Sequence, residues 1–212
     1  MSANSEAWPN GGVAASVLPS IAVVARTAYV DPVRYVVLLR GVNVGGRNRV
    51  PMSALTEVLS DRYDGVRAYL QTGNVVLESE ESSAEVASWI EQALPRSFEL
   101  DSDLIRALVL DRDAFERVVA EAPPEFGADN ETYRYDVAYF IGATTAEIEP
   151  YVSTNPEVDV VTWGSLAFYH RRIAALASRS RVSRLIGTPA YSSLTLRNWR
   201  TTARLADMLR EA

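Results

Sequence analysis

The stretch that decides the fold is RYVVLLRGVNVGGRNRVPMSAL, residues 34–55. Its first part, Arg34–Arg40, is a continuous apolar run bounded by two arginines, which is typical of a buried strand. Gly41–Val50 is rich in glycine and asparagine and indicates a connecting loop. Pro51 suits the start of a helix, and the apolar residues after it recur at the spacing of one helical face. The stretch therefore predicts a strand, a glycine loop and a helix in succession.

Downstream of this stretch, short apolar runs predict three more strands, at Val66–Gln71, Asn74–Glu78 and Leu104–Leu110. Thr72-Gly73 separates the first two, and its glycine stands where a hairpin needs a positive φ. Ser82 and Glu85 have the spacing of a capping box, which predicts a helix from residue 83 to Leu94. The resulting order of strand, helix, two strands, helix and strand is the split βαβ unit of ferredoxin-like folds.

The second half of the chain shows the same kind of pattern less regularly, so we expect an α+β fold with a second, looser copy of the unit. The expected helices are Asp113–Glu121, Thr145–Tyr151, Arg179–Ile186 and Leu196–Glu211, and the expected strands are Tyr135–Ile141, Val158–Trp163 and Leu166–Arg171. Gly164-Ser165 predicts a type II′ turn between the last two strands.

The expected domain organisation has three parts. Residues 1–32 are small and polar with one short apolar run, and their first basic residue is Arg26, which argues against a secretory signal. This stretch is interpreted either as a disordered leader or as the artefact of a wrongly assigned start site, with Val33 as the true initiator. A ferredoxin-like half follows at 33–110, and a second α+β half with a C-terminal basic helix at 111–212.

Missing residue types exclude several kinds of chemistry. The chain of 212 residues has no cysteine and no lysine, and His170 is its one histidine. Thiolate nucleophiles, Schiff bases, phosphate-loop lysines and multi-histidine metal sites are therefore excluded. We expect no cofactor and no metal, and the catalytic residues of an enzyme on this chain are not identifiable.

Charge is unevenly spread along the chain, whose net charge is −6. From Arg171 onward, nine arginines face only Asp207 and Glu211. Such a basic segment fits an anionic partner, but docking on the acidic remainder of the chain is the simpler explanation. No apolar run is long enough to span a bilayer, so we expect a cytoplasmic protein with no membrane partner.

Three segments are candidates for ligand binding. Glycine-loop amides before a helix form an anion cradle by default, and basic and amide side chains add to it. The candidate residues are Arg40, Asn43, Gly45, Gly46 and Arg47 in the loop, Gln71 and Asn74 at the hairpin tip, and Arg197 and Asn198 at the expected start of the last helix. The alternatives are an exposed connection, a plain turn, and a packing helix on which Arg197, Arg200 and Arg204 form a solvated face.

Two further residues have structural explanations. His170 alternates with Leu166 and Phe168, so we expect a buried histidine paired with a neighbour rather than a general base. Asp111 or Asp113 stands where it would cap the helix that follows.

Three blocks of the chain carry a family resemblance. LLRGVNVGGRNRVPMSAL (38–55), VRAYLQTGNVVLES (66–79) and TLRNWRTTARLADML (195–209) are similar to signature blocks of domain of unknown function 1697, an uncharacterised bacterial family. The resemblance implies a two-part, ferredoxin-related α+β fold and a cytosolic protein, but no reaction. Ser183-Arg184-Leu185 stands where members commonly have Ser-Lys-Leu, so any amine chemistry of that lysine would be lost here.

From these residues we expect a protein that binds an anionic ligand, either a phosphate-bearing small molecule or a nucleic acid, through the glycine loop and the Arg197-Asn198 segment. Two alternatives remain open. One is a small-molecule enzyme that uses arginine, asparagine and carboxylate groups at the same place. The other is an interaction module without a ligand. The sequence leaves the oligomeric state open.

Overall fold

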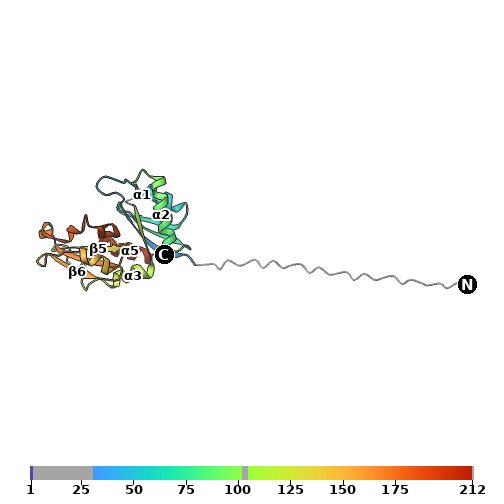
Figure 1. Ribbon diagram of the computed structural model, residues 1–212. Coiled ribbons are helices and arrows are strands. Elements are labelled where there is room, and N and C mark those ends of the chain that lie inside the picture. Colours follow the sequence, from blue (N-terminus) through green and yellow to red (C-terminus); the bar gives the residue numbers. More distant parts are fainter. Residues whose placement is uncertain (2–30, 102–104, 212) are drawn as a thin grey trace. The chain divides into compact units, whose positions relative to one another are not determined.

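The computed structural model describes Met1, residues 31–101 and residues 105–211 of the chain (Figure 1). Apart from Met1, Asp31 and Pro32, the leader predicted at 1–32 lies outside the described residues. Among the helices of the described ranges, none is both long and apolar enough to cross a membrane.

The first half has the predicted order of elements. They are β1 (Val33–Arg40), α1 (Met52–Ser60), β2 (Asp64–Tyr69), β3 (Asn74–Ser79), α2 (Ser83–Ser97) and β4 (Arg106–Asp111). The strands form an antiparallel sheet in the order β2-β3-β1-β4. The split βαβ prediction is confirmed. The capping box of Ser82 and Glu85 is also present at the start of α2.

The apolar run of β1 is continuous because both faces of this central strand are covered. Val37 and Leu39 face the helices α1 and α2, whose buried residues Leu55 and Ile90 belong to the same core. Leu38, on the opposite face, belongs to a second core that also includes residues of the other half of the chain. A strand buried on both faces reads as an unbroken apolar run rather than an alternating one.

The second half repeats this architecture. Its elements are α3 (Arg112–Ala120), β5 (Tyr133–Phe140), α4 (Thr145–Ile148), β6 (Asp159–Trp163), β7 (Ala167–Ile173), β8 (Leu194–Asn198) and α5 (Trp199–Arg210), with 3₁₀ helices η2 (Glu149–Tyr151), η3 (Ala174–Arg179), η4 (Val182–Leu185) and η5 (Pro189–Ser193). The antiparallel sheet order is β6-β7-β5-β8, which matches β2-β3-β1-β4 strand for strand. The second copy is confirmed, with η3–η5 in the place of α2.

The last predicted helix is confirmed as α5, but its predicted start is wrong. Leu194–Asn198 is the strand β8, so the helix expected from Leu196 begins only at Trp199, with Asn198 as its cap. Pairing with β5 keeps this segment extended, and that partner lies more than fifty residues away in the sequence. The helix expected at Arg179–Ile186 is replaced by the ends of η3 and by η4.

The type II′ turn at Gly164-Ser165 is also wrong, because Gly164 does not have the positive φ that this turn requires. The carboxylate of Glu121 accepts hydrogen bonds from the Ser165 amide (2.7 Å) and hydroxyl. A Cβ on Gly164 would lie 2.6 Å from that carboxylate. Glycine is needed here for close approach.

Helices α3 and α5 join the two halves. They pack against each other, and α5 contacts β1 and β3 of the first sheet as well as β5 and β8 of the second. Buried residues of both helices and both sheets form one shared core. Within it the Tyr139 hydroxyl lies 2.8 Å from the Thr202 hydroxyl. Helices α1 and α2 lie on the outer side of the first sheet (Figure 1).

Gly127 provides a test of this packing. It has φ +91, and a Cβ there would lie 2.0 Å from the Trp199 ring, whereas Gly142 has φ +64 and open space around it. Replacement of Gly142 by alanine should cost about 1 kcal/mol for backbone strain alone. Gly127→Ala should cost about 3 kcal/mol, because the Trp199 ring must also move. Urea unfolding of the two variants measures this, and equal costs would contradict the packing described.

Candidate functional site

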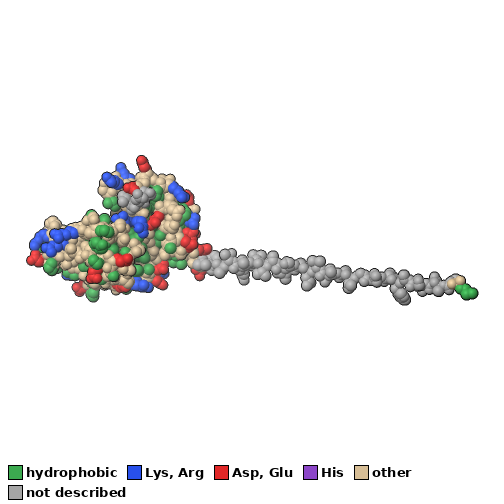
Figure 2. Space-filling model, in the orientation of Figure 1, with side chains coloured by type: hydrophobic (Ala, Val, Ile, Leu, Met, Phe, Trp, Pro, Cys, Tyr) green, Lys and Arg blue, Asp and Glu red, His purple; other side chains and the backbone are tan. Residues whose placement is uncertain are grey.

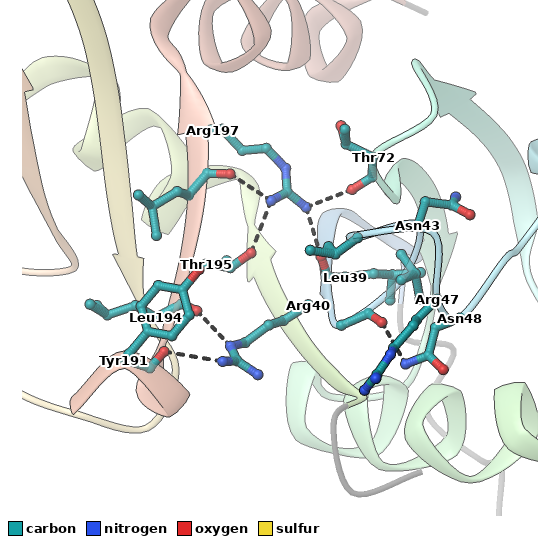
Figure 3. A pocket seen from close by; sticks show the side chains of 14 residues that line it. Leu39, Arg40, Asn43, Arg47, Asn48, Thr72, Tyr191, Leu194, Thr195 and Arg197 are labelled. Atoms are coloured by element: carbon teal, nitrogen blue, oxygen red, sulfur yellow. Dashed lines mark hydrogen bonds between the residues drawn. The ribbon is translucent and has the colours of Figure 1, made fainter. Parts of the chain in front are cut away.

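A cavity of about 390 Å³ lies where the end of β1 and the glycine loop meet β8, and we call it the site pocket (Figure 3). It is lined by Leu39, Arg40, Gly41, Val42, Asn43, Val44, Arg47, Asn48, Thr72, Tyr191, Leu194, Thr195, Leu196 and Arg197. Three of these residues are arginines, and no described acidic residue is among them. On the face shown in Figure 2, basic side chains also gather where the two halves meet.

The glycine loop has an unusual backbone. Gly41, Asn43, Gly45, Gly46 and Asn48 all have a positive φ. For the two asparagines this conformation is uncommon, and such residues persist where the surrounding structure holds them. The loop between β1 and α1 therefore has a defined backbone conformation and is not an irregular linker.

The side chains of the two asparagines hold the loop. Asn43 mimics a strand partner for Val50, since its Oδ1 accepts from the Val50 amide (2.8 Å) and its Nδ2 donates to the Val50 carbonyl (2.9 Å). Asn43 also donates to the Gln71 carbonyl, and Asn48 donates to the Gly41 carbonyl (2.7 Å). These side-chain amides fix the loop in place, and their hydrogen bonds are made within the protein rather than to a ligand.

Arg197 is the central residue of the site. It extends from β8 into the end of the first half and is 8% exposed. Its guanidinium donates to six acceptors: the side chains of Asn74 and Thr195 and the carbonyls of Leu39, Thr72, Gly73 and Leu196. Figure 3 shows the hydrogen bonds to Thr195, Leu196, Leu39 and Thr72. Four of the six acceptors belong to the first half, so Arg197 ties the two sheets together at this end.

The charge of Arg197 is stabilised by hydrogen bonds to protein groups but is not neutralised by an ion pair in the described parts of the chain. Its acceptors are all uncharged, and none of the ion pairs within the described residues includes Arg197. Burial lowers its pKa to about 10, so it stays protonated at neutral pH. The site pocket therefore borders a permanent positive charge. Because Arg197 is buried, solvent screens this charge only weakly.

Arg40 and Arg47 keep donors for a ligand. Arg40 donates from Nε to the Leu194 carbonyl (3.0 Å) and from Nη2 to the Tyr191 carbonyl (3.4 Å), which leaves Nη1 without an acceptor among the described residues. Its guanidinium also lies 5.3 Å from the centre of the Tyr191 ring. Arg47 is exposed, and its side chain has no hydrogen-bond acceptor in the described parts of the chain.

Strand β8 is an edge strand, so one side of its backbone is not paired with another strand of its sheet. It is the last strand of its sheet, and the Ile141 amide donates to the Ser193 carbonyl, which sets the direction of the backbone groups that follow. Because these groups alternate along an antiparallel strand, those of Leu194 and Leu196 face away from β5. Arg40 and Arg197 occupy the two carbonyls. The Leu196 amide points the same way and adds a donor at the pocket.

The structure brings together some of the residues predicted from the sequence and separates others. Arg40, Asn43, Arg47 and Arg197 line the site pocket. Those that do not line it are Gly45 and Gly46 at the exposed loop tip, Gln71, Asn74, which is buried beneath Arg197, and Asn198, which caps α5. The first turn of α1 does not line it either, so the expected convergence of loop and helix N-terminus is absent from this pocket.

Arg197 also differs from its predicted surroundings. Because it lies on a strand, it does not share a helical face with the exposed Arg200 and Arg204. Tyr191 and Thr195 line the pocket but were not among the predicted residues. Thr195 stands in the same sequence block as Arg197, whereas nothing in the sequence around Tyr191 indicates a site.

His170 is buried and paired, as predicted. It is 4% exposed, and its Nε2 lies 3.0 Å from the carboxylate of Asp159. Burial lowers the pKa of His170, more than the hydrogen bond to Asp159 raises it, so the imidazole is neutral at pH 7. Asp111 caps α3 through the Ala114 amide, again as predicted. No group of three or more metal-binding side chains occurs among the described residues.

Replacement of Arg197 tests its role as a tie between the halves. Arg197→Met should destabilise the protein by 3 kcal/mol or more, by an estimate of roughly 1–3 kcal/mol for each buried acceptor left unpaired. Arg200→Gln is the matched control, because Arg200 is exposed on the next element, and it should change stability by less than about 0.5 kcal/mol. Denaturant unfolding compares them, and a near-neutral Arg197→Met would contradict the role described.

The lowered pKa of His170 predicts a loss of stability in mild acid. The unfolded chain takes up the proton first, near its ordinary pKa of about 6.5, so stability is complete above that pH and falls as the pH drops below it. The melting temperature of the unsubstituted protein should therefore decrease as the pH is lowered from about 7 to about 5.5. His170→Gln, which removes the one histidine, should flatten this slope, and an unchanged slope would contradict the assignment.

The chain is similar to one protein family and to solved structures. Residues 33–169 match the family model described as "Protein of unknown function (DUF1697)". No curated protein matches the chain. Among solved structures, a conserved bacterial protein from Streptococcus pneumoniae is 24% identical with a TM-score of 0.69, and the match covers 84% of this chain and 99% of that one. This likeness shows the fold. Because the family model covers more than half of the sequence, the chain belongs to the DUF1697 family of proteins of unknown function.

Proposed function

We propose that the protein binds a phosphate-bearing anion in the site pocket. Arg40 and Arg47 make the direct contacts, and Arg197 acts through its charge. The observation that carries this proposal is the buried guanidinium of Arg197, which has no carboxylate partner among the described residues and lies beside a cavity lined by two further arginines and no described acid.

The division of labour follows from the hydrogen bonds. The donors of Arg197 are directed at protein acceptors, so this residue cannot reach out to a ligand. Its charge still acts at a distance: an anion about 6 Å away gains roughly 3 kcal/mol at an effective dielectric constant of about 20. Arg40 and Arg47, whose donors are partly or wholly unoccupied, supply the charge-assisted hydrogen bonds.

A phosphate group suits this arrangement better than a smaller anion. It offers several acceptor oxygens that two guanidinium groups and the Leu196 amide can share. Arg40 is already held by the Leu194 carbonyl and the Tyr191 ring, and the asparagine clamps hold the loop that carries Arg47. Such preorganisation reduces the entropy lost on binding. We also propose a bacterial cytoplasm as the setting, in keeping with the family resemblance.

Thermal protection by inorganic phosphate and by sugar phosphates tests the proposal. A ligand at a hundredfold excess over its dissociation constant should stabilise the native protein by about 2.7 kcal/mol. Arg47→Gln should weaken this binding at least tenfold without changing the melting temperature of the free protein, because Arg47 is exposed and makes no contact that the fold needs.

Arg49→Gln is the matched control. Arg49 is exposed in the same loop but does not line the pocket, so its loss changes the net charge equally and should leave binding within about twofold of the native value. Equal weakening by both substitutions would indicate general charge attraction and contradict the pocket. Absence of protection by every phosphate-bearing compound would contradict the function itself.

A further inference from the structure

A second cavity lies directly beside the site pocket. It measures about 420 Å³ and is lined by Asp136, His170, Arg172, Ala177, Ser180, Val182, Ser183, Leu185, Ile186, Tyr191 and Leu196. Tyr191 and Leu196 line both cavities. The two cavities are therefore neighbours that share lining residues of η5 and β8.

Several lining residues of the second cavity are apolar. Leu185 and Val182 are buried, whereas Ile186 is 64% exposed and Leu196 is 41% exposed. These two are among the most exposed large apolar side chains that the structure describes. Apolar side chains left open at the mouth of a cavity, beside a cationic cavity, are typical of a site that covers the apolar part of a polar ligand.

Part of the lining is polar, and Asp136, His170 and Arg172 lie on the same face of the second sheet as Leu196. Asp136 and Arg172 form an ion pair whose two side chains remain 23% and 28% exposed, so both keep hydrogen-bonding capacity toward the cavity. His170 is fixed through Nε2 by the carboxylate of Asp159, and its Nδ1 lies 3.4 Å from Nη1 of Arg172. Arg172 and Asp136 thus present donors and acceptors, as recognition of a heterocycle edge requires.

Tyr191 connects the two cavities. Its ring is stacked near the guanidinium of Arg40, which also donates to the Tyr191 carbonyl, so the ring is positioned by the residue that contacts the anion. An aromatic ring at this place can contact the flat face of a heterocycle or a sugar. Two cationic side chains, an aromatic ring, and a cavity lined by both apolar and polar side chains therefore lie next to one another.

We infer that the ligand is a mononucleotide, whose phosphate binds Arg40 and Arg47 and whose base enters the second cavity, where it contacts Ile186, Leu196, Asp136 and Arg172. This inference rests on the proposed function, because it assigns the phosphate to the same pocket. The base adds contacts that inorganic phosphate and sugar phosphates cannot make. Together the two cavities have the size of a site for a ligand of this kind.

Calorimetric titration of the full chain with inorganic phosphate, the four common nucleoside monophosphates and the matching nucleosides tests the inference. At least one monophosphate should bind tenfold or more tightly than inorganic phosphate. Ile186→Ser should remove most of that advantage and leave phosphate binding unchanged, because Ile186 does not line the site pocket. Arg47→Gln should weaken both ligands. Tyr151→Ser is the matched control for loss of an exposed apolar side chain and should leave all affinities unchanged.

The outcomes separate the inference from the proposed function. If phosphate protects the protein but no monophosphate binds more tightly than phosphate, the base site is wrong and the anion site stands. The base site is equally wrong if Ile186→Ser leaves the advantage of the monophosphate intact, or if only oligonucleotides bind. If neither phosphate nor any nucleotide binds, both proposals are wrong.

Discussion

The structure depends on one buried guanidinium. Arg197 lies on β8 of the second sheet. Four of its six acceptors belong to the first half, at the end of β1 and the tip of the β2–β3 hairpin. Burying a charge is expensive, and hydrogen bonds to neutral groups offset only part of that cost. The remaining charge is the basis of the anion binding proposed for the adjacent cavity. The same residue therefore holds the halves together and sets the chemistry of the site between them.

The repeated architecture explains why such a site exists. Each half has four strands in the same order, and a single copy would leave one face of its sheet without helices. Here those faces share one core with α3 and α5 between them. The loop after β1 and the edge strand β8 thereby come together, and the pocket between them belongs to neither copy alone.

The sequence predicted the parts of this protein that depend on local pattern. The continuous apolar run of β1, the capping box of α2 and the order of elements in the first half follow from side-chain periodicity. Strand β8 was missed because five extended residues next to a strong amphipathic helix resemble its first turn. The environment of Arg197 was missed with it, because four of its six acceptors are more than a hundred residues away in the sequence. Grouping Arg40, Arg47 and Arg197 was possible from composition alone, whereas Tyr191 was not, since only folding places it there.

Occupation of the β8 carbonyls has a consequence for the solubility of the protein. An edge strand with open backbone groups is a template on which a strand of another molecule can add. At this edge, guanidinium groups of Arg40 and Arg197 already bind the Leu194 and Leu196 carbonyls, and the Leu194 amide donates to the Tyr191 carbonyl. An incoming strand would have to displace two arginines and bring its own backbone against their charges. The residues that make the pocket cationic thus also protect this edge from intermolecular β-sheet formation and aggregation.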